Sequence, residues 1–412
     1  MNIQIDAVRR RVSLDPRDPT FFNDPYPAYR AIREAAPTFF WEQYGFWCFS
    51  RHGEVSSLLR DRRFGRQILH LTSRAQLGWS EPPAHLKPFF DLERHSLLEL
   101  EPPGHTRLRN LVNRAFVSRQ VERLAPRIAA LTNKLIDGLV AQGSANLLDV
   151  LATPIPVIVI AELLGVPAEM WPRLLDWSHR MVAMYQFGVS RSVEDGAAAA
   201  ALEFADFLRA YVEERRCRPG EDLISQLIAA QSEGGRLSED ELIATCVLLL
   251  NAGHEATVHA IGNGVKALLE GPAAARSALA VDGARASLIE ELLRYDAPLH
   301  LFTRFVLEDL KFEGVAFKKG ERIGLLLGAA NRDPERFPDP DRIEAARTPN
   351  PHVSFGGGIH FCIGAPLARL ELATVLPIIV DRLPNLEFAA PARYRDSFHF
   401  HGLEALWARW RA

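Results

Sequence analysis

Apolar residues recur every three or four positions through the middle of the chain, which is the spacing of amphipathic helices. Between about residues 126 and 270 this pattern runs through RIAALTNKLIDGLVAQ, VIVIAELLGV and AALEFADFLRAYVEERR. Strand-like runs lie elsewhere: FWCFS near 46–50, FTRFVLEDLKFEGVAF near 302–317, RIGLLL near 322–327 and the C-terminal SFHFHGLEALWARW. The pattern predicts a mainly α fold with small sheets near the N-terminus and in the last third of the chain.

Composition adds bounds on organisation and location. The 27 prolines and 27 glycines are spread along the chain as turn signals, with no internal repeat. We therefore expect residues 1–412 to form a single domain, although length alone would allow two or three. A net charge of −3 gives no sign of a nucleic-acid partner. The N-terminus lacks the apolar core of a signal peptide and no run approaches the roughly 18 apolar residues of a membrane span. We expect a cytoplasmic protein with no membrane partner.

One predicted helix is unusually long. Ser238 followed by Glu241 is typical of a capping box, the apolar run LIATCVLLL comes next, and Gly271-Pro272 is a stop signal. The helix would be about 50 Å long at 1.5 Å per residue. Its middle, NAGHEATVHA at 251–260, holds a glycine that costs about 1 kcal/mol relative to alanine and a glutamate among apolar residues. Both residues need a reason.

Zinc is the first candidate, because His-Glu with a later His is similar to the HExxH metalloprotease helix. The spacing rejects this motif. His254 and His259 are five apart, which places them about 140° from each other around a helix. They cannot share one zinc ion, and we expect both to be ordinary partly buried or surface residues.

The strongest chemical signal is SFGGGIHFCIGA at 354–365, followed by the helix-like PLARLELATVLPIIVDRL. Consecutive glycines allow positive φ and a close backbone approach. Cys362 precedes the helix, whose partial positive charge and free N–H groups favour the thiolate. It is therefore a nucleophile or a metal ligand, with a buried structural cysteine as the alternative. The segment lacks the GK[ST] of a phosphate loop and the GxGxxG of a dinucleotide turn. The four cysteines are scattered, so we expect reduced thiols.

Phe355, Gly358, Cys362 and Gly364 reproduce the FxxGxxxCxG haem-binding signature of the cytochrome P450 family. The match continues in family order over nearly the whole chain, through DPYPAYRAIREAAP, EPPGHTRLRNLVNRAF, PIPVIVIAELLGVP, the long helix, EELLRYDAP and ANRDPERFPDPDR. The chain thus resembles the soluble bacterial members. The resemblance implies the cytochrome P450 fold, an α-rich triangular prism with small β-sheets.

The resemblance also implies haem b (iron protoporphyrin IX) as the cofactor, with the Cys362 thiolate as the axial ligand of the iron. Phe355 would shield the sulfur from water, while Gly358 and Gly364 would let backbone N–H groups approach it. The haem propionates would be held by His105, Arg109, Arg304 and His360. The first two of these are four residues apart, so a helix would present them on one face.

Glu291 and Arg294 match the ExxR pair of the family, three residues apart on one helix face. Arg342, in PDPDR, is expected to be the third member of this group. We interpret the trio as structural, because removing one partner of a buried ion pair costs about 3–5 kcal/mol.

The resemblance gives the long helix a function. Ala252 and Gly253 would leave room for dioxygen, through small side chains and a local widening of the helix. Glu255 matches the acid of the (A/G)GxDT or (A/G)GxET pattern and would lead into a water or proton relay. Where the family has an alcohol, this chain has Ala256. Thr257 lies about 100° further round the helix, so it cannot simply replace that alcohol. Either ordered water, with Thr257 at its edge, or a hydroxyl or carboxylate of the substrate would have to complete the relay.

Apolar residues at the family's pocket-lining positions suggest a hydrophobic or amphipathic small-molecule substrate. Each of them has ordinary core packing as its alternative. The set is Phe89, Phe90, Leu97, Leu249, Ala252, Leu299, Leu301, Phe302 and Phe398, with Met184 and Tyr185 as lid candidates.

The expected partners are the substrate, dioxygen, a ferredoxin and a ferredoxin reductase, with the chain itself a monomer. The electron donor is expected to be separate because the chain ends soon after the cysteine loop, with no flavin- or ferredoxin-like extension. Arg107, Arg114 and Arg369 could offer a positive patch to the donor, or serve only solubility.

The leading hypothesis is a haem-thiolate monooxygenase that inserts one oxygen atom from dioxygen, most often as a hydroxylation. The replacement of the alcohol by Ala256 also admits substrate-assisted oxidation, desaturation or C–C cleavage. A peroxide-driven peroxygenase is a second alternative, disfavoured by the acid at Glu255. A haem-based binding or sensor protein is the non-enzymatic alternative. A thiol hydrolase using Cys362 with His360 is remote, because no orienting acid is evident.

Overall fold

The structure is a computed structural model that describes residues 1–113, 121–232 and 237–411. Its internal contacts divide the chain into two compact units. Unit 1 comprises Met1–Gly65, Glu122–Thr153 and Ala256–Ala412, and unit 2 comprises Arg66–Val121 and Pro154–Glu255. Within the described ranges, no helix is long and apolar enough to cross a membrane.

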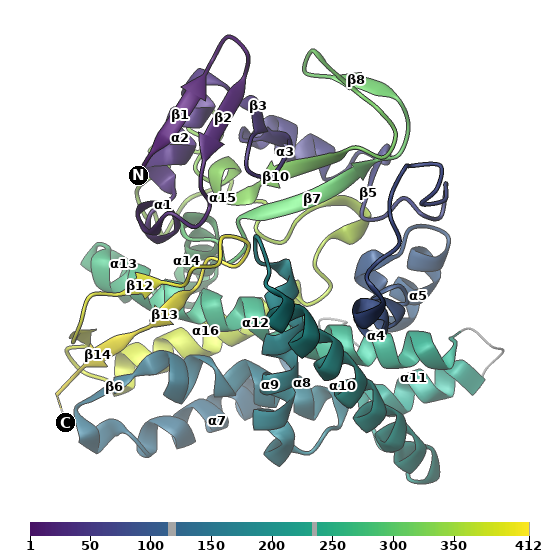
Figure 1. The fold of residues 1–412 in the computed structure, drawn as a ribbon. Helices are drawn as coiled ribbons and strands as arrows, with labels where there is room; N and C mark the ends of the chain where they lie inside the picture. Colours follow the sequence, from purple (N-terminus) through teal and green to yellow (C-terminus); the bar gives the residue numbers. More distant parts are fainter. Residues whose placement is uncertain (114–120, 233–236, 412) are drawn as a thin grey trace. The chain divides into compact units, whose positions relative to one another are not determined.

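Unit 1 is built around a seven-stranded mixed sheet in the order β1-β2-β3-β4-β10-β7-β5 (Figure 1). The pairs β2/β3 and β4/β10 are parallel, and the others are antiparallel. Side chains on this sheet alternate between faces, so Phe39, Trp41 and Cys48 are fully buried in its core. The strands are β1 (Ile3–Asp6), β2 (Arg11–Leu14), β3 (Thr38–Trp41), β4 (Phe46–Phe49), β5 (Phe64–Gly65), β7 (Leu301–Val306) and β10 (Arg322–Leu326).

Small two- and three-stranded sheets complete the β structure of this unit. One has the order β11-β14-β6, and the pairs β12/β13 and β8/β9 form the other two. Their bounds are β6 (Ser144–Asn146), β8 (Leu310–Phe312), β9 (Val315–Phe317), β11 (Glu387–Phe388), β12 (Arg393–Tyr394), β13 (Leu403–Ala405) and β14 (Trp407–Arg409). The strand-like runs predicted from the sequence are thereby confirmed.

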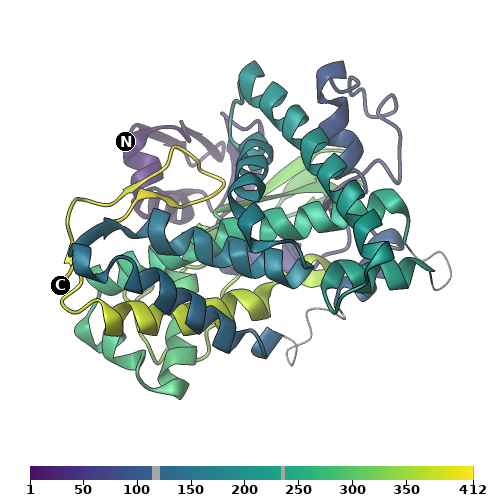
Figure 2. The ribbon, with the colours of Figure 1, turned by 90° about the horizontal axis from the view of Figure 1, so that it is seen from below.

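Helices α7 and α16 of unit 1 lie side by side (Figure 2). Arg382 of α16 donates to Asn133 (2.6 Å) and Asp137 (2.6 Å) of α7, at one end of this contact. The helices of the unit are α1 (Pro19–Asn23), α2 (Tyr26–Ala35), α3 (His52–Leu58), α7 (Ala125–Asp137), α13 (Ala273–Ala278), α14 (Asp282–Tyr295), α15 (Leu327–Ala330) and α16 (Ala365–Arg382), with a π-helical turn at Leu148–Ala152.

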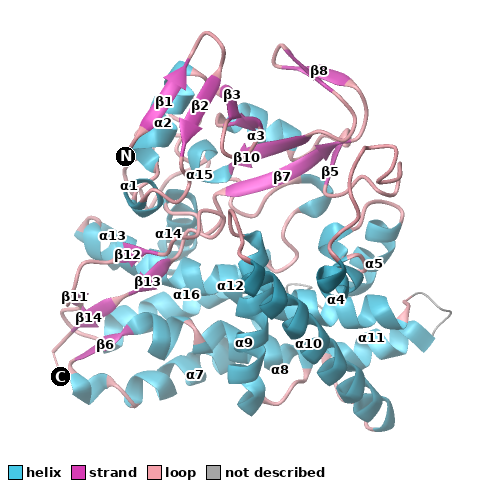
Figure 3. Cartoon of the chain, viewed as in Figure 1, coloured by secondary structure: helices cyan, strands magenta, loops and turns pink. Residues whose placement is uncertain are grey.

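Among the residues of unit 2 that the structure describes, the regular elements are all helical (Figure 3). Helix α10 packs against both α9 and α4, and the Trp177 ring of α9 stacks on Phe204 of α10 with 4.9 Å between ring centroids. The helices are α4 (Lys87–Glu93), α5 (Gly104–Asn113), α8 (Pro154–Leu164), α9 (Trp171–Val182), α10 (Arg191–Cys217) and α11 (Leu223–Ser232).

Helix α12 (Glu239–Glu270) continues from unit 2 into unit 1. Its start confirms the predicted capping box, because the Glu241 backbone N–H donates to the Ser238 hydroxyl (3.2 Å) and the Ser238 N–H donates to the Glu241 carboxylate (2.9 Å). It ends at Glu270, directly before the predicted stop signal Gly271-Pro272. The helix is α-helical through residues 251–257, so the expected local widening is not seen.

Candidate haem site and oxygen-side helix

The cysteine loop lies between α15 and α16 in sequence and packs against Leu59 at the end of α3. Gly356 and Gly358 have φ of +69° and +65°, which side chains other than glycine rarely adopt. A Cβ on Gly358 would lie 2.4 Å from the Leu59 carbonyl oxygen, and one on Gly356 would lie 3.2 Å from the Phe302 ring. The Cys362 N–H donates to the Phe355 carbonyl (3.0 Å). The loop therefore has the shape that only glycine allows at these two positions.

The four cysteines have very different surroundings. Cys48 and Cys246 are buried, and this burial raises the pKa of Cys48 well above its ordinary value and that of Cys246 to about 12. Cys217 is exposed but is the last residue of α10, at the negative end of that helix dipole. Cys362 is exposed and lies just before α16, where the dipole favours one. Only Cys362 combines access with an electrostatic field that stabilises a thiolate.

Phe355 is half-buried and carries a cation on its face. The Arg369 guanidinium lies 4.5 Å from its ring centroid and pairs with Glu290 of α14 (2.6 Å). Burial alone would raise the pKa of Glu290, but hydrogen bonds from Arg369 and His352 outweigh it and lower the pKa to about 2. An ionised Glu290 thus holds Arg369 over Phe355 and fixes the base of the loop.

Two predicted propionate ligands belong to unit 1. Arg304, on β7, is 3% exposed, and its Nη1 donates to the Thr303 carbonyl (2.9 Å). Its guanidinium lies 5.8 Å from the ring of Phe302, the residue that contacts Gly356. His360 is half-buried at the end of the short 3-10 turn Gly358–His360. Arg304 therefore lies on the strand that packs against the cysteine loop.

The other two predicted propionate ligands belong to unit 2. His105 is buried and Arg109 half-buried, and both lie on α5. Their spacing places them on one face of the helix, as predicted. Arg107 of the same helix pairs with Glu241, and Arg114 lies outside the described residues.

The ExxR group corrects one prediction. Glu291 accepts from Arg294 Nε (2.7 Å) and Nη2 (2.8 Å), with both side chains fully buried. The third guanidinium is that of Arg347, whose Nε lies 3.1 Å from both Glu291 oxygens. Arg342 is exposed and contributes its backbone carbonyl to Arg294 (3.1 Å). The prediction of Arg342 was wrong because both arginines lie in an irregular segment, where sequence spacing does not show which side chain points toward Glu291.

The middle of α12 separates small accessible residues from buried polar ones. Ala252 is exposed and Ala256 half-buried, and their spacing of four places them on one helix face. Thr257 is 5% exposed and Glu255 6%. Thr257 is turned about 100° from Ala256, as expected.

Gly253 packs closely against α8. A Cβ there would lie 2.6 Å from Cγ1 of Ile160. The glycine thus lets two helices of unit 2 approach, a structural reason that differs from the predicted room for dioxygen.

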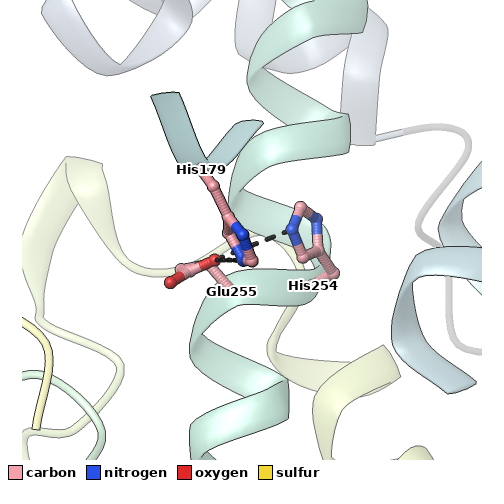
Figure 4. A group of neighbouring side chains, drawn as sticks. All are labelled: His179, His254 and Glu255. Atoms are coloured by element: carbon pink, nitrogen blue, oxygen red, sulfur yellow. Dashed lines mark ion pairs between the residues drawn. The ribbon is translucent and has the colours of Figure 1, made fainter. Parts of the chain in front are cut away.

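Glu255 lies beside two histidines of unit 2 (Figure 4). Its Oε2 is 3.5 Å from Nε2 of His179 and 3.7 Å from Nε2 of His254. Sequence reasoning missed this group because His179 lies on α9, far from α12 in sequence. His259 instead packs against Phe400 and Gly402 in unit 1, which agrees with the rejection of a zinc site between His254 and His259.

Two of the predicted pocket residues belong to the hydrophobic core. Leu301 and Phe398 are in the buried cluster of unit 1, where the Phe398 ring lies 5.1 Å from Phe21 and 5.3 Å from Trp41. Burial in this cluster does not test whether they also line a substrate pocket, so that assignment stays a prediction. Leu299 and Phe302 are half-buried against the adjoining cluster.

The remaining pocket candidates lie in unit 2 and vary in exposure. Phe89, Leu97 and Leu249 are buried, Met184 and Tyr185 half-buried, and Phe90 is 38% exposed. Burial, followed by the negative charges of Glu93 and Glu99, raises the pKa of Tyr185 well above its ordinary value. Tyr185 is therefore a neutral phenol that lies beside the half-buried Glu93.

These residues fit a haem. A flat iron-containing macrocycle with acidic side groups matches three features of the site. They are the soft sulfur ligand of Cys362, the loop whose Gly356 and Gly358 leave no room for Cβ atoms, and the buried Arg304 on the adjacent strand.

Comparison with known proteins supports the same assignment. The family model "Cytochrome P450" matches residues 286–388. The polyketide biosynthesis cytochrome P450 PksS of Bacillus subtilis (strain 168) is 33% identical, with 96% of this chain and 98% of that protein covered. The 6-deoxyerythronolide B hydroxylase of Saccharopolyspora erythraea is 36% identical, over 95% of this chain and 97% of that protein.

A solved structure of epothilone B-bound cytochrome P450epoK superposes with a TM-score of 0.89 at 29% identity, covering 97% of this chain and all of that chain (100%). The fold is thus the α-rich cytochrome P450 fold with small sheets. The chain belongs to the cytochrome P450 family, binds haem b and is a cytochrome P450 monooxygenase.

Proposed function

We propose that Cys362 is the axial ligand of the haem and that the two compact units form one cytochrome P450 domain. The observation that carries the ligand assignment is the contrast among the cysteines: Cys362 alone is exposed before a helix N-terminus. Haem bound there supplies activation of dioxygen for insertion of one oxygen atom into the substrate. Electron paramagnetic resonance of the oxidised holoprotein tests the ligand. A low-spin thiolate signal is expected in the wild type and in Cys217→Ser, and its persistence in Cys362→Ser would refute the proposal.

The cysteine loop has two tasks in this proposal. Phe355, stacked by Arg369, keeps water from the sulfur, while the left-handed Gly358 and the small Gly364 keep the backbone close to it. A Cβ on Gly364 would stand 3.9 Å from the Cys362 Sγ. The propionates are assigned to His105, Arg109, Arg304 and His360.

On the oxygen side, Ala252 and Ala256 provide a small-residue surface, while Gly253 lies against Ile160 of α8. Glu255 moves protons through its carboxylate, with His179 and His254 as neighbours that can exchange them. Thr257 is buried away from that surface, which supports ordered water or a substrate hydroxyl or carboxylate as the group that completes the relay.

The two forms of the relay make different predictions for Ala256→Thr. If the substrate supplies the donor, the added hydroxyl should leave product formed per NAD(P)H consumed unchanged or lower. A rise in this coupling with no loss of rate would refute substrate assistance and favour the water relay.

The substrate is proposed to be a hydrophobic or amphipathic small molecule that is hydroxylated. Its support is the apolar character of Phe89, Phe90, Leu97 and Leu249, together with relatives named for polyketide biosynthesis and 6-deoxyerythronolide B hydroxylation. Screening such compounds for a substrate-induced spin-state shift of the haem tests this class. A shift only with small hydrophilic compounds would refute it.

The electron donor is proposed to be a ferredoxin with its reductase, acting on a monomeric chain in the cytoplasm. The predicted arginine patch supports a ferredoxin-docking surface less than expected, because Arg107 pairs with Glu241 and Arg369 pairs with Glu290. Turnover should therefore depend on added ferredoxin yet change little in Arg107→Gln. Equal turnover without any ferredoxin would contradict the proposal.

A further inference from the structure

His179, His254 and Glu255 form a compact group in unit 2 that supplies the carboxylate of the proposed proton relay but holds no part of the haem itself. Helix α9 supplies His179, and consecutive positions of α12 supply the other two (Figure 4). One ligand atom from each residue lies within 4.8 Å of the others. Two imidazoles and one carboxylate are a common ligand set for divalent transition metals, including zinc.

The tautomer of His254 is fixed by its own helix. Its Nδ1 lies 2.6 Å from the Leu250 carbonyl oxygen, which can only accept a hydrogen bond. Nδ1 therefore carries the proton, and Nε2 is the atom that faces the Glu255 carboxylate. A histidine that donates Nδ1–H to a backbone carbonyl is the usual way in which a metal-binding imidazole is oriented.

The distances between the facing atoms favour a bridging cation over a proton. A neutral His254 would direct a lone pair at a carboxylate that also only accepts, and both residues are buried, with exposed fractions of 2% and 6%. A proton between them would give a charge-assisted hydrogen bond of about 2.7–2.9 Å. The observed separations from Glu255 Oε2 are 3.5 and 3.7 Å. Ligand atoms around a tetrahedral zinc ion lie about 3.3–3.6 Å apart, given bonds of about 2.0–2.2 Å.

Access to the group is through His179, whose side chain is 44% exposed, while the other two residues are buried. Three protein ligands leave a fourth position for water. We propose that His179, His254 and Glu255 bind one divalent transition metal ion of the zinc type, which cross-links α9 to α12. Its binding occupies the carboxylate of Glu255 and so competes with proton transfer through that residue.

A second group of one acid and two histidines lacks the geometry of a metal site. Asp296, His300 and His401 of unit 1 also lie within 4.8 Å of one another. Asp296, however, already accepts hydrogen bonds from Tyr26 and Tyr394, and the His300 and His401 rings stack at 4.2 Å with planes 29° apart. Nearly parallel rings cannot direct both lone pairs at one ion, and all three residues are buried.

Zinc titration of the tag-free holoprotein, carrying Cys217→Ser to remove an exposed thiol, tests the proposal. Calorimetry should show one tight equivalent, and affinity should fall at least tenfold in His179→Ala and in Glu255→Gln. His85→Ala, which removes a histidine from the isolated pair with Glu194 (2.8 Å), and His401→Ala should bind as the parent does. Because His179 is partly exposed, its variant is expected to fold, and circular dichroism checks this.

A second measurement reads the ligands directly. X-ray absorption at the zinc edge should report two imidazoles and a carboxylate in the parent protein and one imidazole fewer in His179→Ala. Equal affinity of His179→Ala and its parent, no tight zinc equivalent, or a loss confined to His401→Ala would each overturn the proposal.

Discussion

Arg347, and not Arg342, should support the buried carboxylate of Glu291. Arg347 is 6% exposed, its Nε contacts both Glu291 oxygens at 3.1 Å, and its Nη1 donates to the Pro338 carbonyl (2.8 Å). Hydrogen bonds to charged groups contribute about 1.5–3 kcal/mol each, and breaking a buried ion pair costs about 3–5 kcal/mol. Glu291 would keep its two contacts with Arg294, so Arg347→Gln should lower the free energy of unfolding by about 3 kcal/mol.

Urea denaturation of the holoprotein, followed by far-UV circular dichroism and by haem absorbance, measures this loss. Arg342→Gln is the matched control, because that exposed side chain should change stability by no more than about 0.5 kcal/mol. The direction in which stability changes with pH also follows from the pKa of Glu291. Burial alone would raise the pKa of Glu291, but Arg294 outweighs it and lowers the pKa, so its stabilising effect is present above the ordinary value of 4.5 and is lost as pH falls through the lowered one. Equal effects of the two substitutions, or a larger effect at Arg342, would refute the reasoning.

Two further predictions concern buried positions. Gly253→Ala should destabilise the protein by about 1 kcal/mol in urea denaturation, because the clash with Ile160 outweighs the gain in helix propensity. Gly283→Ala in α14 is the control and should stabilise the protein, because the space around that glycine is open. A change of the same sign in both variants would contradict the packing argument. Glu371 is fully buried in α16, no hydrogen-bond partner of its carboxyl oxygens is present among the described residues, and burial raises its pKa well above 4.5. The unfolded chain ionises first, so this group removes about 1.4 kcal/mol of stability per pH unit as pH rises above 4.5. Glu371→Gln should abolish that contribution, and an unchanged slope of stability against pH would show that Glu371 is ionised in the folded protein.

The sequence predicts best where signals are local. The capping box at Ser238 and Glu241, the stop at Gly271 and the strand runs all depend on neighbouring residues, and the structure confirms them. The glycine loop before Cys362 is also a local signal, because left-handed backbone at Gly356 and Gly358 needs glycine in any surroundings.

Prediction fails where contacts join distant segments. Arg347 reaches Glu291 across 56 positions from an irregular segment, so periodicity could not distinguish it from Arg342. His179 of α9 approaches Glu255 of α12 only in the folded chain, across 76 positions of sequence. The core packing of Leu301 and Phe398 could not be predicted either, because apolar residues look alike in sequence whether they contact protein or ligand.

The central claim is that the Cys362 thiolate holds the haem iron, and the spectrum of the reduced protein under carbon monoxide tests it most directly. The wild type and Cys217→Ser, which removes the other exposed cysteine, should both show the red-shifted Soret band of thiolate ligation. Cys362→Ser should lack that band while circular dichroism shows that it is folded. A thiolate-type band that persists in Cys362→Ser, or its absence from the wild type, would contradict the account.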